Sequence, residues 1–179
     1  MDALSGIAIL QTQAGFDDEM EIFFDIAQTA AQTISDAERR AEALKGIAVA
    51  QAQRKKHDEA QRTFATAQGA AQTIAHERNR ARTLFEIATT EARIGYDDNA
   101  LQTIVLILLN RHKYLPEFAS IFVAKGDNAH FKALLLPCAS YLDAAYAMCG
   151  HLARLYPAQA AGIAEVIQQQ EHLDKPSEG

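Results

Sequence analysis

Hydrophobic residues recur along most of this chain at the spacing of an α-helix. In the stretch from Ala41 to Arg80, Leu44, Ile47 and Ala48 follow one another at intervals of three and one, and Gln51 comes three positions later. Such intervals place side chains on one face of a helix, whereas strict alternation would indicate a strand. The pattern therefore predicts an all-α fold.

The same pattern returns with a period of about 40 residues, which lies in the range typical of stacked repeat units. Seven positions of the central stretch have counterparts both one period earlier and one period later, and most of them are apolar. The three sets are Leu4, Ile7, Ala8, Gln11, Met20, Phe24 and Ala27, then Leu44, Ile47, Ala48, Gln51, Ala60, Phe64 and Ala67, then Leu84, Ile87, Ala88, Glu91, Ala100, Ile104 and Ile107. Stacked units of this kind bury a continuous core.

Turn and capping residues divide the pattern into helices. Glycine favours the left-handed conformation that ends a helix, and Asp or Ser followed by Glu or Gln three positions later favours a helix start. The expected ends are Gly15, Gly95 and Gly126, and Pro137 is expected to end or kink its helix. The expected starts are Asp18 with Glu21, Ser35 with Glu38, Asp58 with Gln61, and Asp98. The run from Ile104 to Leu109 is apolar on all sides, which predicts burial from both directions.

These boundaries give five helix pairs, at about 2–40, 41–80, 81–112, 113–138 and 140–171. We expect the pairs to form a single repeat domain over residues 1–171, because each unit needs a neighbour to cover its hydrophobic face. The remaining residues, 172–179, are polar and include a proline, and we expect them to form a flexible tail.

The central repeat resembles the tetratricopeptide (TPR) pattern. Leu44, Ile47, Ala48 and Gln51, followed by Ala60 and Phe64, match its Leu-Gly-Tyr and Ala-x3-Phe spacing. The departures are a unit longer than the usual length of about 34 residues, Ala for Gly, Gln or Glu for Tyr, and no closing Pro. The resemblance implies a right-handed α-solenoid of antiparallel helix pairs. It also implies a bacterial protein, since Ala-rich repeats of this style are typically bacterial. An armadillo or HEAT-type helical array is the structural alternative.

The resemblance also implies that the first helix of each pair lines a concave face that binds a partner. The candidate residues on that face are Ile9, Lys45, Val49, Gln53, Phe85, Thr89 and Arg93, with Ser5, Thr12, Glu86 and Ser120 beside them. A trap for a peptide carboxylate is not predicted, because only Lys45 matches the required set. We expect the face to bind an extended or helical segment with apolar anchors and some acidity; a solvated face is the alternative reading.

A second candidate surface lies on the second helix of the first pair. Ile22, Phe23 and Ile26 stand beside its core residues, whereas their counterparts one period later are polar. Additional apolar surface on one terminal unit indicates either a self-association patch or a local tertiary contact.

The net charge, the cysteines and the N-terminal sequence argue against several classes of partner and location. The net charge of −6 argues against a non-specific nucleic-acid binder and against an anionic membrane surface as partner. Two cysteines, expected as small core residues, make no disulfide framework, and the start lacks a signal-peptide pattern, so we expect a cytoplasmic protein.

Signatures of catalysis are missing from the sequence. It has no glycine-rich phosphate loop, nucleophile elbow or zinc-protease motif, and its six histidines are scattered. We therefore predict no enzyme, no cofactor and no metal site. The leading hypothesis is a protein–protein interaction module; the alternative is a structural self-assembling repeat protein, with a helical nucleic-acid reader as a third, weaker hypothesis.

Overall fold

The computed structural model describes residues 17–107, 111–139 and 142–157, and within these residues the chain forms eight helices and no strand. The helices are α2 (Asp17–Gln32), α3 (Ala37–Gln53), α4 (His57–Gln72), α5 (Glu77–Ile94), α6 (Asp97–Val105), α7 (Arg111–Lys125), α8 (Asn128–Ala139) and α9 (Leu142–Leu155). The all-α prediction is confirmed. Residues 1–16 of the first expected pair, residues 158–171 of the last one and the tail at 172–179 lie outside the described residues.

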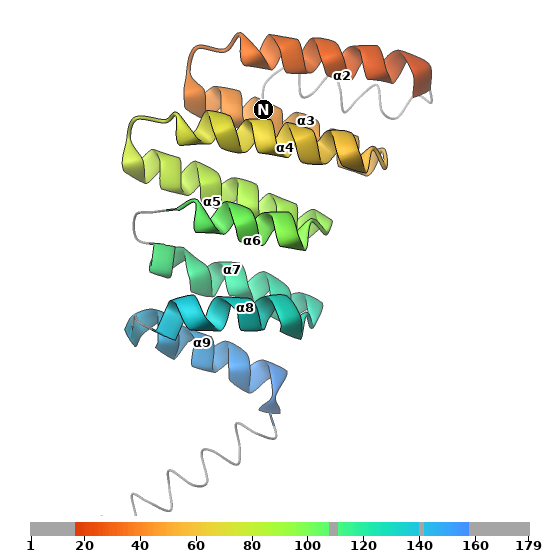
Figure 1. Ribbon diagram of the computed structural model, residues 1–179. Coiled ribbons are helices and arrows are strands. Elements are labelled where there is room, and N and C mark those ends of the chain that lie inside the picture. The colour runs from red at the N-terminus through yellow and green to blue at the C-terminus, as the bar shows by residue number, and fades with distance from the viewer. Residues whose placement is uncertain (1–16, 108–110, 140–141, 158–179) are drawn as a thin grey trace, which may run out of the picture. The chain divides into compact units, whose positions relative to one another are not determined.

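The chain divides into two compact units, residues 1–111 and 112–179. In the first, α3 and α4 form one helix pair and α5 and α6 form the next, each joined by a short turn (Figure 1). Helix α2 packs on α3, and α5 packs on both α3 and α4. In the second unit, α8 packs on α9. The division of the chain into five repeat units within one domain stays a prediction.

The repeated positions form the core of the first unit. From Met20 to Ile107, every described member of the three repeated sets is buried, and Ala48, Ala60, Ala88 and Ala100 have no exposed surface. Small side chains at these points let paired helices approach closely, while Phe64 fills the space beside them. Burial of a side chain of that size stabilises the fold by about 1.5–3 kcal/mol.

A buried polar triad joins three helices and recurs in the next repeat. Thr63 Oγ1 of α4 accepts a hydrogen bond from Gln28 Nε2 of α2 at 2.7 Å and lies 2.7 Å from Gln51 Oε1 of α3. The second triad consists of the counterparts, which are Gln68 of α4, Thr103 of α6 and Glu91 of α5. We call these the α2–α3–α4 joint and the α4–α5–α6 joint.

Several predicted helix starts are shifted by one or two positions. Helix α3 is capped by Asp36 rather than Ser35, because the Asp36 carboxylate accepts a hydrogen bond from the Arg39 amide at 2.8 Å. Glu38 therefore completes no capping box and instead binds Arg82 and Asn79 of α5.

Three other aspartates predicted as caps lie inside the first turn of their helices. Helix α4 begins at His57, ahead of Asp58, and α6 begins at Asp97, ahead of Asp98; neither helix has a side-chain cap. Asp18 likewise lies within α2. Negative charge in the first turn still stabilises a helix through the helix dipole. The aspartates therefore correctly indicated that a helix begins nearby, although they do not cap it.

Helix α8 continues through Pro137 to Ala139, so this proline does not end the helix. The prediction for the apolar run is wrong. The run that starts at Ile104 is not buried on both sides, since α6 ends at Val105 and that side chain is 57% exposed. Ile104, within α6, and Ile107, beyond its end, are both buried.

In the second unit, hydrophobic residues of α7 at intervals of three, one and three form part of the core. The buried residues are Leu115, Phe118, Ala119 and Phe122. The rings of Phe118 and Phe122 pack edge to face, with their centroids 5.3 Å apart. The Nε2 atom of His151 in α9 lies 3.0 Å from the backbone carbonyl oxygen of Pro116 in α7. This contact links the two helices. None of the described helices is long and apolar enough to cross a lipid bilayer.

The α3–α4 and α5–α6 turns have the same backbone form but different residues at the left-handed position. Gly95 has φ +96° and Gly126 has φ +69° at the predicted helix ends, whereas Lys55, the counterpart of Gly95, has φ +61°. In both turns of the first unit the following amide bonds back to the carbonyl of residue 51 or 91. A side chain in this conformation is strained and glycine is not.

A reciprocal exchange tests this turn. We expect Lys55→Gly to raise the free energy of unfolding by about 1 kcal/mol and Gly95→Lys to lower it by a similar amount. A Cβ at Gly95 would meet no atom within 4 Å, so the loss would come from the backbone and not from a clash. Urea denaturation followed by circular dichroism measures both, and equal stability of all three proteins would contradict the account.

Candidate partner-binding surfaces

Six of the predicted partner-binding residues form two matching stripes. Each stripe has residues four apart on one side of a helix, namely Lys45, Val49 and Gln53 on α3 and, one period later, Phe85, Thr89 and Arg93 on α5. Helices α3 and α5 pack together, so these residues share one region, which we call the α3–α5 face. The seventh, Ile9, lies outside the described residues.

The members of the α3–α5 face differ in exposure. Gln53 and Arg93 are exposed, while Val49 and Phe85 are half-buried. Thr89 is buried, and its hydroxyl bonds to a backbone carbonyl of its own helix. The face therefore presents two partly exposed apolar side chains and two exposed polar ones, whereas Thr89 belongs to the underlying packing.

Lys45 is held by carboxylates and is not an isolated anchor. Its Nζ lies 2.7 Å from Glu42 Oε2 on the same helix and 3.7 Å from Glu86 Oε2 on α5. An ammonium group between two carboxylates is neutralised, so an acidic partner would have to compete with both of them. The sequence did not indicate this, because it does not place Glu86 beside α3.

A hollow of about 320 Å³ adjoins the face at the start of α3. It is lined by Asp36, Glu38, Arg39, Glu42, Thr83 and Glu86, four carboxylates against one guanidinium. We call it the α3–α5 hollow. Lys45 and Arg82 pair with three of these carboxylates, so four carboxylates face three cations in all. The remaining negative charge favours a basic group over an acidic one, whereas Lys45 and Arg93 suggested an acidic segment in the sequence.

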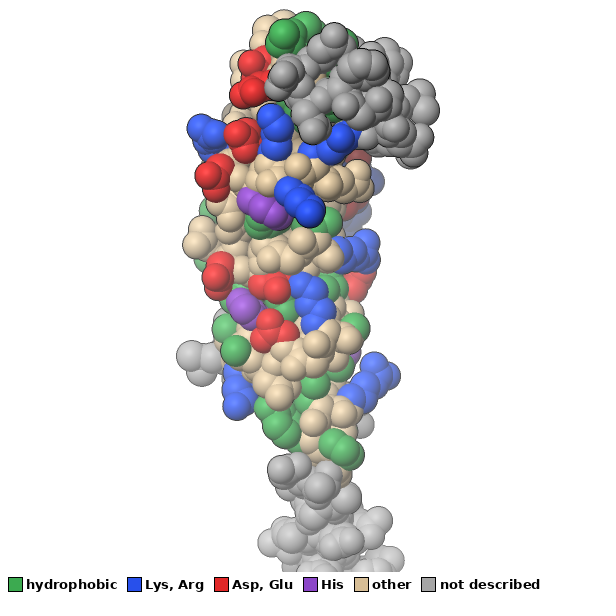
Figure 2. Space-filling model, turned by 90° about the vertical axis from the view of Figure 1, so that its right-hand side faces the viewer, with side chains coloured by type: hydrophobic (Ala, Val, Ile, Leu, Met, Phe, Trp, Pro, Cys, Tyr) green, Lys and Arg blue, Asp and Glu red, His purple; other side chains and the backbone are tan. Residues whose placement is uncertain are grey.

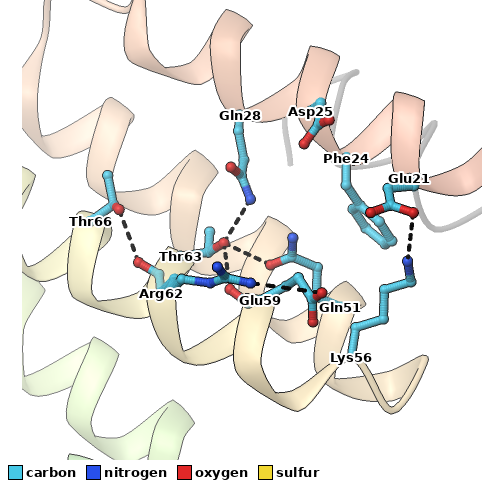
Figure 3. A pocket seen from close by; sticks show the side chains of 10 residues that line it. All are labelled: Glu21, Phe24, Asp25, Gln28, Gln51, Lys56, Glu59, Arg62, Thr63 and Thr66. Atoms are coloured by element: carbon cyan, nitrogen blue, oxygen red, sulfur yellow. Dashed lines mark hydrogen bonds and ion pairs between the residues drawn. The ribbon is translucent and has the colours of Figure 1, made fainter.

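A second pocket, also of about 320 Å³, lies where α2 faces α4 and the end of α3 (Figure 3). We call it the α2–α4 pocket. Its lining consists of Glu21, Phe24, Asp25, Gln28, Gln51, Lys56, Glu59, Arg62, Thr63 and Thr66. Sequence reasoning did not single out this set, although Gln28 and Thr63 recur one period later and could have been found by that signal.

Ion pairs account for most of the charge in the α2–α4 pocket. Lys56 Nζ lies 3.7 Å from Glu21 Oε2, and Arg62 Nη2 lies 3.8 Å from Glu59 Oε1. Asp25 points from α2 toward the pocket, and no hydrogen bond or ion pair joins it to the other residues drawn in Figure 3. The lining therefore carries one carboxylate more than its cations balance.

The predicted patch on α2 is largely exposed. Ile22 is 62% exposed and Ile26 55%, whereas Phe23 is half-buried. By contrast, acidic and basic side chains are interspersed with small hydrophobic areas on the face in Figure 2. Large aliphatic side chains this exposed are uncommon elsewhere in the described chain, where Val105 and Ile94 are the other examples.

The cysteine prediction is wrong for Cys149, which is exposed on α9. Its position follows from helical spacing, because Met148, one position earlier, takes the buried place. The side chain of Cys138 lies outside the described residues. Among the histidines, His57 Nδ1 lies 2.9 Å from the Tyr96 hydroxyl and thereby joins the two turns of the first unit.

Glu91 is the one acidic member of the two joints and has no exposed surface. Burial raises its pKa from 4.5 to about 7, although hydrogen bonds from Thr103 and Gln68 act in the opposite direction. Thr103 Oγ1 lies 2.5 Å from Oε2, and Gln68 Nε2 lies 2.9 Å from Oε1. The corresponding residue of the other joint, Gln51, is neutral at every pH.

Only the α4–α5–α6 joint is expected to make stability depend on pH. The pKa of Glu91 is higher in the folded than in the unfolded chain, so stability is greatest below pH 4.5 and falls as the pH rises to about 7. We expect Glu91→Gln to match the wild type at low pH and to exceed its free energy of unfolding by about 3 kcal/mol at pH 8.

The reverse substitution is the control for this prediction. Gln51→Glu places a carboxyl group in the α2–α3–α4 joint and should introduce the same loss of stability at high pH. Denaturation curves of the three proteins between pH 4 and pH 8 give the comparison. Parallel pH profiles for the wild type and Glu91→Gln would show that burial does not hold the proton on Glu91.

Comparison with known proteins supports the fold alone. No protein-family model matches the chain, and no curated protein is significantly similar to it. The crystal structure of Ton1535 from Thermococcus onnurineus NA1 is similar, with a TM-score of 0.53 and 19% sequence identity. The matched region covers 90% of this chain but 47% of that one, so the chain spans about half the length of that structure.

Proposed function

We propose that this chain is a non-catalytic protein-interaction module, a right-handed TPR-like α-solenoid whose α3–α5 face binds a segment of a partner protein. The observation that carries the proposal is the repetition of one buried framework. Core positions and polar joints recur from one repeat to the next, while the surface residues at corresponding positions of the two repeats differ.

A repeated framework suits binding because it is rigid before the partner arrives. Helices locked together by buried contacts lose little conformational freedom on association, so more of the contact energy appears as affinity. Val49 and Phe85 are partly exposed apolar contacts on two adjacent helices, and Gln53 and Arg93 offer hydrogen bonds beside them. Such a surface suits an extended or helical segment with apolar anchors.

The charge beside the face defines the partner further. Glu42 and Glu86 surround Lys45, and the α3–α5 hollow next to them is lined mostly by carboxylates. We therefore expect the partner segment to carry basic residues next to its apolar anchors. The net charge of −6 would also draw such a segment toward the protein at low ionic strength.

The repeat supplies a variant that should fold normally. Val49→Thr, Phe85→Lys and Arg93→Gln each install the residue found at the matching position of the other stripe, namely Thr89, Lys45 and Gln53. We expect this triple variant to keep the wild-type stability and to bind the partner at least about tenfold more weakly, a loss of about 1.4 kcal/mol.

The measurement is affinity capture from a cell lysate with quantitative mass spectrometry, followed by titration of the purified partner. Arg78→Gln, which repeats the Arg93→Gln substitution at another exposed position of α5, is the control for the lost arginine. A protein retained by the wild type and by the control but lost from the triple variant would support the face. Equal retention by all three baits would refute it.

A second candidate function is self-assembly through α2, favoured by the exposure of Ile22 and Ile26. Aliphatic surface that faces water on one helix is a common mark of an interface between copies. Phe23 is a poor probe because it is half-buried, and a charge there could disturb the fold.

The test of self-assembly again uses counterparts from the next repeat. Ile22→Arg with Ile26→Thr copies Arg62 and Thr66, which are exposed at the matching places on α4. If α2 drives assembly, the mass of the wild type measured by light scattering should rise with concentration while the variant stays monomeric. A concentration-independent mass for the wild type would dismiss this candidate.

A further inference from the structure

The α2–α4 pocket and its counterpart in the next repeat share a framework but not their charges. Phe24, Gln28 and Thr63 have counterparts of the same type in Phe64, Gln68 and Thr103. Each charged lining residue, however, is replaced by a neutral one in the next repeat. Glu21, Asp25, Lys56, Glu59 and Arg62 correspond to Gln61, Ala65, Tyr96, Asn99 and Gln102. The framework therefore does not need these charges.

The joint beneath the pocket is also less complete than its counterpart. In the α4–α5–α6 joint, Gln68 Nε2 reaches both Glu91 and Thr103, so both carboxyl oxygens are occupied. In the α2–α3–α4 joint, Gln28 reaches Thr63, and Thr63 reaches Gln51 Oε1.

One polar atom of Gln51 is consequently left over. The residue is only 2% exposed, it lines the pocket, and its Nε2 has no hydrogen bond within the described part of the chain (Figure 3). This amide nitrogen adjoins an open pocket, so it can donate a hydrogen bond to an acceptor that enters the pocket.

We infer that the α2–α4 pocket binds a basic side chain, arginine or lysine, presented by a peptide segment of a partner protein. The excess carboxylate, Asp25, supplies the charge for a guanidinium or ammonium group, and Glu59 on α4 is a second acceptor on the lining. The Gln51 amide donates to a backbone carbonyl of the same segment. A volume of about 320 Å³ accommodates one side chain and its peptide group.

Charge complementarity selects this occupant over an acidic one. Both cations of the lining are already paired, Lys56 with Glu21 and Arg62 with Glu59, so an acidic group would have to break an ion pair. A basic group gains Asp25 without breaking either pair. The inference does not depend on the α3–α5 face, because no lining residue of this pocket belongs to that face.

The probe is a fluorescein-labelled peptide of alternating glycine and arginine, titrated against the full chain by fluorescence anisotropy. An otherwise identical peptide with glutamine in place of arginine reports binding that does not need the charge. We expect the arginine peptide to bind the wild type and the glutamine peptide to bind at least about tenfold more weakly.

The decisive variant is Asp25→Ala with Glu59→Asn, which copies Ala65 and Asn99 and should therefore fold. Its control, Glu77→Gln with Asp98→Asn, removes two negative charges elsewhere in the same compact unit. We expect the decisive variant to lose at least about tenfold in affinity for the arginine peptide and the control to lose less than about twofold.

Equal affinity of the decisive variant and its control would overturn the inference, as would equal binding of the two peptides by the wild type. The triple variant of the α3–α5 face should bind the arginine peptide as the wild type does. Failure of this pocket and failure of the proposed function are thus separate outcomes.

Discussion

The hydroxyl group of Thr63, held between side chains of two other helices, fixes the arrangement on which the rest of the first compact unit depends. A buried hydroxyl must find partners within the protein, and Gln28 and Gln51 provide them. Because each partner comes from a different helix, a shift of any one helix along its axis would break a hydrogen bond of this buried hydroxyl group. Hydrophobic contacts alone would tolerate such a shift more readily, since they are not directional. The polar joint therefore sets register, and its repetition at Thr103 sets the same register one repeat later.

The two joints also show how one geometry serves two chemistries. An amide at residue 51 and a carboxyl group at residue 91 occupy corresponding places with similar partners. The amide adds no dependence on pH, whereas the carboxyl group is most compatible with burial when protonated. The second joint thus contributes less stability at high pH, while its hydrogen bonds are more numerous.

The sequence predicted correctly which repeated positions are buried, because helical spacing and the repeat determine this. It did not predict contacts between residues of different helices. Helical spacing and the repeat identified buried positions such as Leu44 and Phe64, because side chains that share a helical face share an environment. The cap of α3 was misplaced by one position because Ser35 and Asp36 are both good candidates, and the backbone angles decide between them. The neutralisation of Lys45 could not be foreseen, since Glu86 approaches it from another helix. Likewise, residues from three helices line the α2–α4 pocket, and no local sequence pattern predicts that they come together.

Differences between repeats are more informative about function here than the features that repeat. Positions that recur, such as Ala48 and Ala88, serve packing that every helix pair must solve in the same way. Positions that change while their framework stays constant are free of that requirement, so their residues report on what lies outside the core. Asp25 in place of an alanine, and Phe85 in place of a lysine, are such changes, and both lie at the surface of a helix that neighbouring helices hold in register. Because similarity to Ton1535 speaks only to the fold, function has to be inferred from these positions and from the charges and exposed apolar groups that they provide.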